Sequence, residues 1–360
     1  MTADAAANLS GQEKTPAVPT TMRAWSQSSY GGPEAVQSGE LPVPTPGSGE
    51  VLLQVRATAL NSADVRVMRG EPLLLRAAFG VRRPRQSVRG HDVAATIIRL
   101  GAGVTEFRVG DEVVGEINGG GLAEYATAPT SRLVHRLAPL DPAIAAALPM
   151  AGGTAWQALD LAAVAEGQRV LVIGASGGVG TMAVQLATLR GAEVWALCGQ
   201  RSRALVESIG AQRTYDYRQV QPGDPELSVE ETGGGFDSVI DIAGTAPLRQ
   251  LRALVRSGGS VVLVSGEGNR VLGPIGRLLA ASVLSIGSKR RFRALAAVAK
   301  PPILNQLVAL AADGTLVPVI ERTWSLAQAD AALTHVDAGR TLGKVIVTAA
   351  RASQSAHPPH

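Results

Sequence analysis

Three polar residues in the N-terminal third of the chain have side chains that suit acid–base or carbonyl chemistry. Asn61 and Asp64 lie in the segment NSAD, and His91 lies in GHD. An imidazole titrates near neutral pH and a primary amide can hydrogen-bond a carbonyl oxygen, so Asn61, His91 and Asp64 are the candidate catalytic residues. Each also has a structural interpretation. NSAD is a good start for a helix, Asp64 can pair with Arg69, and His91 can be a buried histidine bonded to the backbone.

A glycine-dense segment, VLVIGASGGVG at residues 170–180, has the pattern of a dinucleotide-binding turn. Its unbroken apolar start predicts a buried parallel strand, the following TMAVQLATLRG predicts a helix, and residues 193–197 predict a second strand. Glycines at such a turn let the backbone approach a pyrophosphate at the positive end of the helix. This βαβ unit therefore predicts a dinucleotide site whose turn contacts are Ser176, Gly177, Gly178 and Val179.

The residues after the second strand bear on which nicotinamide coenzyme binds. A site for NADH places an acidic residue there to accept the ribose hydroxyls. Here Gly199 takes that place and Arg201 and Arg203 follow, and guanidinium groups favour a 2′-phosphate. NADPH is therefore the expected cofactor, although each arginine can also be a solvated residue at a helix start. Val264 and Ser265 end the strand SVVLVSG and are expected at the nicotinamide end, since ligands bind at the carboxyl ends of parallel strands.

The composition places the chain among folded globular proteins and narrows its partners. Of its 360 residues, 46% are hydrophobic and 18% are charged, which is far from the composition of a disordered chain. The net charge is +4, and basic residues cluster at 82–89 and 289–293. Neither cluster has the interleaved aromatic residues of an RNA-binding surface, so no nucleic-acid partner is expected. The clusters are solvated loops or guides for an anionic ligand.

The single cysteine and the longest apolar segment bear on location. Cys198 alone can form neither an internal disulfide nor a cysteine-rich zinc lobe, which favours a reducing compartment, and we expect a cytoplasmic protein. Residues 272–286 contain Pro274 and Arg277 and are too few to span a bilayer. No membrane association is therefore expected.

The order of the predicted elements indicates two kinds of domain. Residues 22–151 show short apolar runs separated by Gly and Pro, which is typical of β-rich structure. Strands and helices then alternate to about residue 300, which predicts a doubly wound parallel sheet. Two helices and two strands follow. Residues 1–21 predict a disordered leader and residues 351–360 a flexible tail.

The late position of the glycine motif and several short motifs carry a resemblance to a known family. These motifs are NSAD with Arg69-Gly70, Gly90-His91-Asp92, GDEV at residue 110, GLAEYA at 121, LPMAGGTAWQAL at 148 and GKVIV at 343. Together they resemble the medium-chain dehydrogenase/reductase superfamily, in its zinc-independent, quinone oxidoreductase-like branch. The resemblance implies an α/β fold in which 22–151 and 301–350 form a GroES-like β-rich catalytic domain and 152–300 form the Rossmann coenzyme domain.

The resemblance also assigns roles to individual positions. Thr154 and Tyr217 match family positions that contact the cofactor, although Thr154, like Ser265, can equally be a cap or turn residue. Asn61 matches the residue beside the nicotinamide. The catalytic zinc ligands of related alcohol dehydrogenases would fall at Asn61, His91 and near Met150, and an amide and a thioether do not replace two thiolates. No metal is therefore expected, the remaining possibility being His91 combined with Asp64 or Asp92.

These observations predict an NADPH-dependent, zinc-independent oxidoreductase that transfers hydride to a quinone or an α,β-unsaturated carbonyl compound. The substrate class and a homodimer, paired through a strand edge near residues 283–288, are implied by the resemblance. Three alternatives stay open: a zinc alcohol dehydrogenase, a non-catalytic NADPH-binding redox sensor, and a biosynthetic tailoring reductase.

Overall fold

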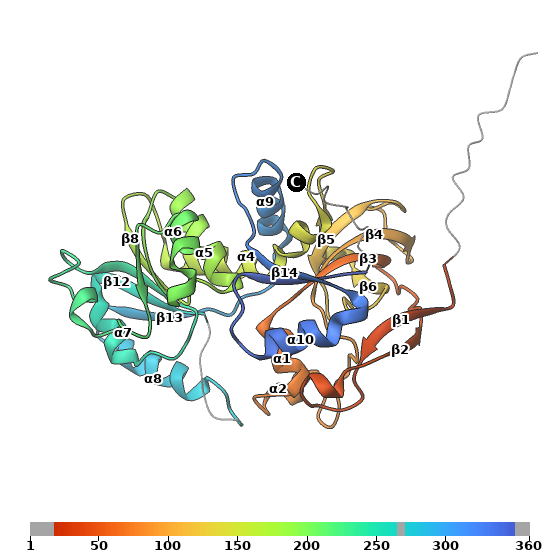
Figure 1. Cartoon of the computed structure of the whole chain (residues 1–360), viewed down its shortest axis with the longest axis horizontal. Coiled ribbons are helices and arrows are strands. Elements are labelled where there is room, and N and C mark those ends of the chain that lie inside the picture. Colours follow the sequence, from red (N-terminus) through yellow and green to blue (C-terminus); the bar gives the residue numbers. More distant parts are fainter. Residues whose placement is uncertain (1–17, 265–270, 350–360) are drawn as a thin grey trace, which may run out of the picture.

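Two large β-sheets lie side by side, with helices packed between and around them (Figure 1). The computed structural model describes residues 18–264 and 271–349. Most of the predicted leader and tail, residues 1–17 and 350–360, lies outside the described residues, and β1 begins at Thr21. Within the described part of the chain, no helix is long and apolar enough to cross a membrane.

The first sheet is parallel throughout and has the strand order β10-β9-β8-β11-β12-β13. Its strands are β8 (Arg169–Ile173), β9 (Glu193–Cys198), β10 (Arg213–Asp216), β11 (Phe236–Asp241), β12 (Val255–Leu263) and β13 (Arg291–Ala294). Val170, Leu171 and Val172 of the central β8 have no exposed surface, because helices cover both faces of the sheet.

Five helices supply that cover. They are α4 (Pro149–Ala162), α5 (Gly178–Leu189), α6 (Arg203–Ser208), α7 (Leu248–Leu254) and α8 (Ile275–Ser285). The first three share one hydrophobic cluster with the sheet, and α7 and α8 share another on the opposite face. This is the predicted doubly wound Rossmann arrangement, and the strand order is its usual 3-2-1-4-5-6 pattern.

The second sheet has seven strands and joins both ends of the chain. Six lie in the order β14-β15-β3-β4-β5-β7, and β6 pairs with β3. They are β3 (Glu50–Leu60), β4 (Asp92–Leu100), β5 (Glu112–Glu116), β6 (Tyr125–Pro129), β7 (Leu133–His135), β14 (Ile320–Ser325) and β15 (Lys344–Thr348). Because β15 pairs antiparallel with β3, the C-terminal segment completes the β-rich lobe, as the GroES-like fold predicts.

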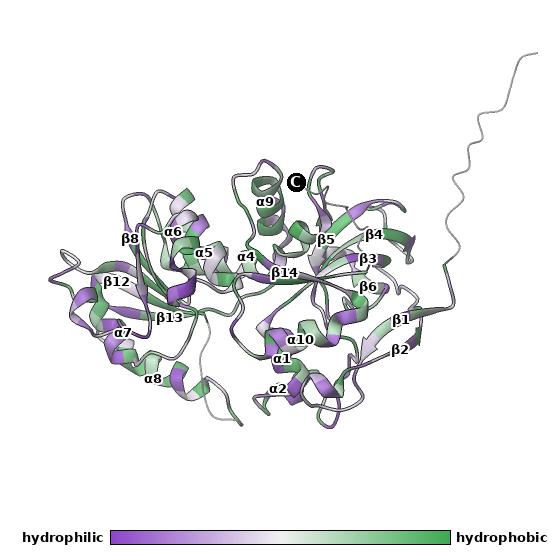
Figure 2. Cartoon of the chain, viewed as in Figure 1, coloured by the Kyte–Doolittle hydropathy of each residue, from purple (hydrophilic) through white to green (hydrophobic). Residues whose placement is uncertain are grey.

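Smaller elements surround the second sheet. A two-stranded sheet is formed by β1 (Thr21–Ser26) and β2 (Gln37–Pro42). The helices of this lobe are α1 (Ser62–Arg69), α2 (Leu75–Phe79), α3 (Pro142–Ala146), α9 (Pro301–Ala312) and α10 (Ala329–Asp337). Between the sheets, α9 is coloured mainly hydrophobic in Figure 2 and packs against α4. The core therefore runs continuously from one sheet to the other.

The predicted strand near residues 283–288 is wrong. Val283 and Ser285 belong to the last turn of α8, and the edge strand is β13. Pro274 starts a helix whose apolar residues Leu278 and Ala281 face the sheet, and this spacing of three to four residues is helical. The true edge strand has the sequence RFRA, whose arginines are typical of exposed sheet edges.

Candidate active site

The carboxyl ends of all six parallel strands lie on one edge of the first sheet, and the strand order reverses between β8 and β11. At such a switch point the loops diverge and leave a crevice for a dinucleotide. The loop after β8 is the glycine turn, and α5 starts at Gly178 with Gly177 as its N-cap. The helix dipole and free N–H groups of α5 therefore point at the crevice.

Three glycines of this turn serve different purposes. Gly174 has a φ of +85°, which L-residues with a side chain adopt only under strain. A Cβ atom on Gly180 would lie 2.1 Å from the Gly174 carbonyl oxygen, so this position must stay bare for the helix to pack on the strand. At Gly177 the nearest atom would be 3.7 Å away. The protein itself therefore leaves room at Gly177, where the turn is expected to face a phosphate group.

The C-terminal strand β15 approaches the same turn. Gly343 donates its backbone N–H to the Ser176 carbonyl oxygen at 2.8 Å and pairs with Gly177 in a parallel bridge. A Cβ atom on Gly178 would lie 2.9 Å from Cδ of Lys344. Val179, the next residue, packs partly buried against the core. The C-terminal segment thus holds the glycine turn against the β-rich lobe.

Lys344, the first residue of β15, contacts one of the predicted catalytic residues, Asn61. Its Nζ donates to Oδ1 of Asn61 at 2.5 Å and lies 3.3 Å from Oδ2 of Asp92. Asn61 Nδ2 donates to the same Asp92 oxygen at 3.0 Å, and the backbone N–H of Met150 donates to Asp92 Oδ1 at 3.1 Å. Both ends of the Asn61 amide are therefore engaged. Burial raises the pKa of Asp92, and Lys344 and Asn61 oppose that rise.

Asp64 and His91 form a second buried pair beside this network. Oδ1 of Asp64 lies 2.6 Å from Nδ1 of His91 and accepts the Gly90 backbone N–H at 2.9 Å. Burial alone would lower the pKa of His91, but the Asp64 carboxylate outweighs it and raises the pKa. Burial likewise opposes the effect of His91 on Asp64, whose pKa is nevertheless lowered. Each member of the pair therefore favours the charged form of the other.

The structure corrects the predicted pairing of Asp64 with Arg69. Asp64 is at the third position of α1, where its Oδ2 accepts the backbone N–H of Asn61 at 2.9 Å. Arg69 instead makes a bidentate pair with Asp337 of α10, at 2.7 and 2.6 Å. Residues three or four apart share a helix face, whereas a spacing of five turns Arg69 away from Asp64.

The predicted phosphate-recognition residues gather at the ends of β9 and β10. Gly199 follows β9, and a Cβ atom there would lie 3.5 Å from the ring of Tyr217, which follows β10 and is exposed. The Arg201 guanidinium is exposed and donates to the Arg340 carbonyl oxygen. Arg203 differs, because its Nε donates to Thr214 Oγ1 at 2.9 Å. Arg203 also lies 4.0 Å from the Glu207 carboxylate, which partly neutralises its charge, whereas Arg201 makes no such ion pair within the described residues.

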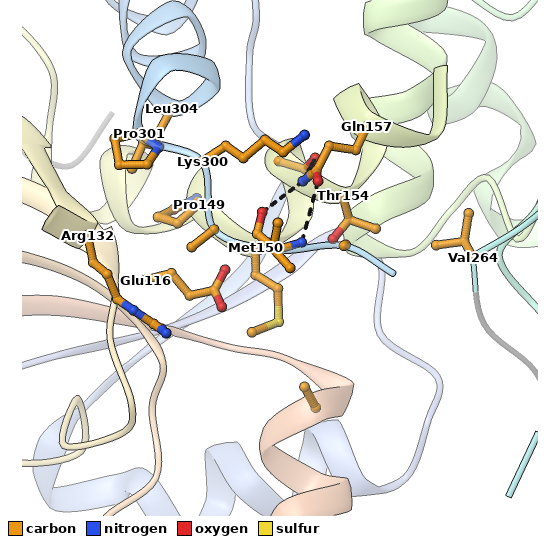
Figure 3. Close-up of a pocket in the computed structure, with 15 residues that line it drawn as sticks. Glu116, Arg132, Pro149, Met150, Thr154, Gln157, Val264, Lys300, Pro301 and Leu304 are labelled. Atoms are coloured by element: carbon orange, nitrogen blue, oxygen red, sulfur yellow. Dashed lines mark hydrogen bonds between the residues drawn. The ribbon is translucent and has the colours of Figure 1, made fainter. Parts of the chain in front are cut away.

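The predicted nicotinamide-binding end of the parallel sheet meets the β-rich lobe at a cavity of about 270 Å³. Thr154 and Val264 line it, as do Met150, Glu116 and Lys300 (Figure 3). Ser265 lies outside the described residues. The loop that closes the top is fixed by Gln157 of α4, whose amide donates to the Val298 carbonyl oxygen at 3.0 Å. The cavity therefore lies between the two lobes.

Glu116 and Lys344 are functional candidates that the sequence-based prediction missed, and Asp92 was considered there only as a possible metal ligand. Lys344 belongs to the quoted GKVIV motif, and Asp92 to GHD, so motif position signalled both. Glu116 is in an ordinary β-strand, and only the tertiary structure brings it to the cavity.

The donor set was tested for a metal. His91 is bonded through Nδ1 to Asp64, Asn61 is bonded to Lys344, and Met150 offers only a thioether. Among residues 18–264 and 271–349, no group of three or more His, Cys, Asp or Glu side chains is arranged to hold an ion. These donors do not match the thiolate and imidazole ligands of a catalytic zinc.

Comparisons with known proteins agree with this architecture. A model described as an alcohol dehydrogenase GroES-like domain matches residues 47–139, and one described as a zinc-binding dehydrogenase matches residues 209–347. A chloroplastic quinone oxidoreductase, QR1 of Triphysaria versicolor, is 35% identical over 342 residues, which cover 91% of this chain and 98% of the relative. A chloroplastic NADPH-dependent alkenal/one oxidoreductase of Arabidopsis thaliana is 29% identical, over 73% of this chain and 67% of the relative.

A solved structure extends the likeness to three dimensions. The quinone oxidoreductase from Coxiella burnetii is 25% identical and superposes with a TM-score of 0.79, covering 92% of this chain and 100% of that chain. A parallel coenzyme sheet joined to a β-rich lobe across a shared cavity defines a two-domain, nicotinamide-dependent oxidoreductase. This chain belongs to the medium-chain dehydrogenase/reductase superfamily and is quinone oxidoreductase-like.

Proposed function

We propose that this protein uses NADPH to reduce a quinone or an α,β-unsaturated carbonyl compound without zinc. The observation that carries the proposal is the cavity of about 270 Å³ between the coenzyme edge and the β-rich lobe. Beside it lies a network of Asn61, Asp92 and Lys344, which is linked to the cavity wall through the backbone N–H of Met150. A bound reduced nicotinamide supplies a hydride, and this chain supplies the surrounding charges and the acceptor pocket.

The choice of NADPH is supported by charge at the far end of the coenzyme edge. Gly199 replaces the acidic residue that would bind ribose hydroxyls, and Arg201 presents an exposed guanidinium beside it. A 2′-phosphate would be attracted by Arg201 and would face no carboxylate at Gly199. The ring of Tyr217 supports the same pocket. Arg203 supports it through its positive charge rather than through a free Nε donor, which Thr214 engages.

The placement of a nicotinamide coenzyme is supported by the glycine turn and by the cavity. Ser176, Gly177, Gly178 and Val179 would hold the pyrophosphate at the start of α5. Thr154 and Val264 would hold the nicotinamide end, since both line the cavity.

The zinc-free proposal is supported by the chemistry of the available donors. The matched family model carries a zinc-binding description, but Asn61 and Met150 stand where thiolate ligands would be required. His91 is the one remaining ligand of that set, and its Nδ1 is already bonded to Asp64 at 2.6 Å.

The substrate class is supported by the names of two relatives, a quinone oxidoreductase and an alkenal/one oxidoreductase. Both acceptors are electron-poor conjugated carbonyl compounds: a quinone takes the hydride at oxygen and an enone at its β-carbon, and neither needs a Lewis acid to be reactive. The test is NADPH consumption by purified protein across a panel of quinones, enones, aldehydes and ketones. Reduction of quinones or enones supports the proposal. Turnover restricted to saturated aldehydes and ketones would contradict it.

We further propose a homodimer in a reducing, cytoplasm-like compartment. Its support is the exposed edge of β13 together with exposed apolar side chains of α8, Leu279 and Val283, and nearby Ile286. Burying these side chains in a second copy would remove apolar surface from water. Sedimentation velocity measures the mass directly, and a monomer at micromolar concentration would refute the dimer.

A further inference from the structure

The carboxylate of Glu116 is a titratable group on the cavity wall that the coenzyme turn and the buried network do not use. Glu116 ends β5, where it pairs across the sheet with Asp92 of β4, and it lines the cavity with Met150 and Thr154. Figure 3 shows its carboxylate directed toward the Met150 side chain. Within the part of the chain that the structure describes, no hydrogen bond or ion pair engages this carboxylate.

Glu112, the other glutamate of β5, is a structural carboxylate and serves as a comparison for Glu116. Glu112 starts β5, accepts a hydrogen bond from Thr96 at 2.6 Å and pairs with Arg136 at 2.7 Å. Its pKa is lowered, because these partners outweigh its burial. Glu116 has the same side chain on the same strand, four residues on, but faces the acceptor cavity. Its lack of partners is therefore a property of its position and not of the strand.

The charges around Glu116 come from every element packed on this end of the cavity. They are Asp92 of β4, His91 just before it, Asp64 of α1, Lys344 of β15 bonded to Asp92, Arg132 of the turn Thr130–Arg132, and Lys300 before α9. Burial raises the pKa of Glu116 to about 6, and the Asp92 and Asp64 carboxylates add to the rise. His91 and Arg132 oppose it. A carboxyl group tuned toward neutrality can give up a proton within the physiological range.

We propose that Glu116 is the proton donor that completes enone reduction in this cavity. The inference rests on the proposed function, because it requires hydride delivery to an enone. Hydride from the reduced nicotinamide forms a C–H bond at the β-carbon, and the alkene electron pair moves to give an enolate. The Glu116 O–H bond then breaks, its proton forms a C–H bond at the α-carbon, and the carbonyl is restored. The Glu116 carboxylate regains a proton from water.

Quinone reduction supplies an internal control for this step. Hydride transfer to a quinone leaves a hydroquinone anion, whose oxygen takes a proton from water without help. Protonation of an enolate at carbon is slow and gains from an acid held in place. The two acceptors therefore share coenzyme binding and hydride transfer, and they differ in their need for Glu116.

The experiment measures NADPH oxidation by wild type, Glu116→Gln and Glu116→Asp with two probes. One is naphthoquinone, and the other is a methylcyclohexenone that carries its methyl group on the α-carbon. Glu106→Gln is the matched control, because Glu106 is an exposed glutamate of the same lobe and does not line the cavity. Circular dichroism and thermal unfolding verify that each variant folds, and the aspartate variant carries the test if the glutamine variant does not.

We expect Glu116→Gln to lower kcat for the enone about a hundredfold and to lower naphthoquinone reduction far less, whereas Glu106→Gln should leave both rates unchanged. Wild-type enone turnover should fall as pH rises above about 6, Glu116→Asp should restore part of the rate, and Glu116→Gln should lose this pH dependence. In D₂O, wild type should place deuterium on one face of the α-carbon, and Glu116→Gln should give both stereoisomers.

The outcomes separate the two proposals. If wild type oxidises NADPH with neither probe, the proposed function fails and the proton donor fails with it. If wild type reduces both probes and Glu116→Gln affects both equally or neither, only the proton donor is refuted. An infrared titration of the coenzyme-free protein adds a readout that needs no turnover. The assignment is supported if wild type shows a protonated-carboxyl band that disappears with a midpoint near pH 6 and Glu116→Gln lacks this band. A band with the same midpoint in both proteins contradicts the assignment.

Discussion

Replacing Lys344 by methionine tests whether the buried network holds the two lobes together. The side chains of Lys344 and Asp92 are 2% and 0% exposed, and their charged atoms are 3.3 Å apart. At an effective dielectric constant of about 20, two unit charges at that distance attract by about 5 kcal/mol, which desolvation of both groups largely offsets. Methionine keeps most of the volume and removes the charge, so Asp92 is left buried without its cation. Removing one partner of such a pair costs about 3–5 kcal/mol.

Two further observations refine that magnitude. Asp92 keeps its hydrogen bonds from Asn61 and Met150, and it can take up a proton, which limits the loss. We therefore expect Lys344→Met to lower the unfolding free energy by about 3 kcal/mol and to lower the thermal midpoint. Lys344→Met combined with Asp92→Asn should recover most of the loss, because the second change removes the stranded charge.

The assay is urea and thermal unfolding of the four proteins of this double-mutant cycle, with Lys289→Met as a control at an exposed lysine. Equal stability of wild type and Lys344→Met would refute the reasoning. Strict additivity in the double variant would refute it too, because it would mean that the two charges do not interact.

Three other perturbations test separate parts of the site. Arg201→Ala should shift the coenzyme preference toward NADH by about tenfold, which is the effect of losing one charge-assisted hydrogen bond. Arg203→Ala should shift the preference less, because Nε of Arg203 already bonds Thr214. Steady-state kinetics with NADPH and NADH measure both shifts. Gly177→Ala should leave the unfolding free energy unchanged but weaken NADPH binding in a fluorescence titration. Gly180→Ala should lower the unfolding free energy, because its Cβ atom would lie 2.1 Å from a carbonyl oxygen. Folding raises the pKa of Glu116 from 4.5 to about 6. The folded protein therefore loses stability as pH rises through this range and Glu116 ionises, and it loses none below pH 4.5, where Glu116 is protonated in both states. Glu116→Gln should therefore gain about 1 kcal/mol over wild type between pH 4.5 and 7 after allowance for solvent screening, and a flat difference in thermal midpoint across that range would contradict it.

The glycine turn and the helix that follows it were readable from the sequence because their information is local. Gly174, Gly177 and Gly180 lie within seven residues of each other, and the strand before them and the helix after them are equally contiguous. Their spacing alone therefore predicts the turn, the helix start and the bare backbone. The β-rich lobe was predicted from its turn spacing together with the resemblance to a family.

The acceptor half depends on contacts between residues far apart in the chain. Lys344 meets Asn61 across 283 positions of sequence, and no local pattern signals that contact. Glu116 has the pattern of an exposed strand residue until the cavity is assembled. The pairing of Asp64 with Arg69 was wrong because charge complementarity was considered without the helix geometry. The predicted strand near residue 283 was wrong because its apolar residues suit either a strand or a helix over so short a range.

The most direct test of the central claim is NADPH oxidation by metal-free protein with naphthoquinone and an enone as acceptors. The protein is treated with a chelator, its zinc content is measured by elemental analysis, and turnover is compared before and after zinc is added back. The account predicts turnover with at least one of the two acceptors, a rate that chelation does not change, and faster reaction with NADPH than with NADH. Loss of activity on chelation with recovery on adding zinc would contradict it, as would coenzyme binding without oxidation by either acceptor.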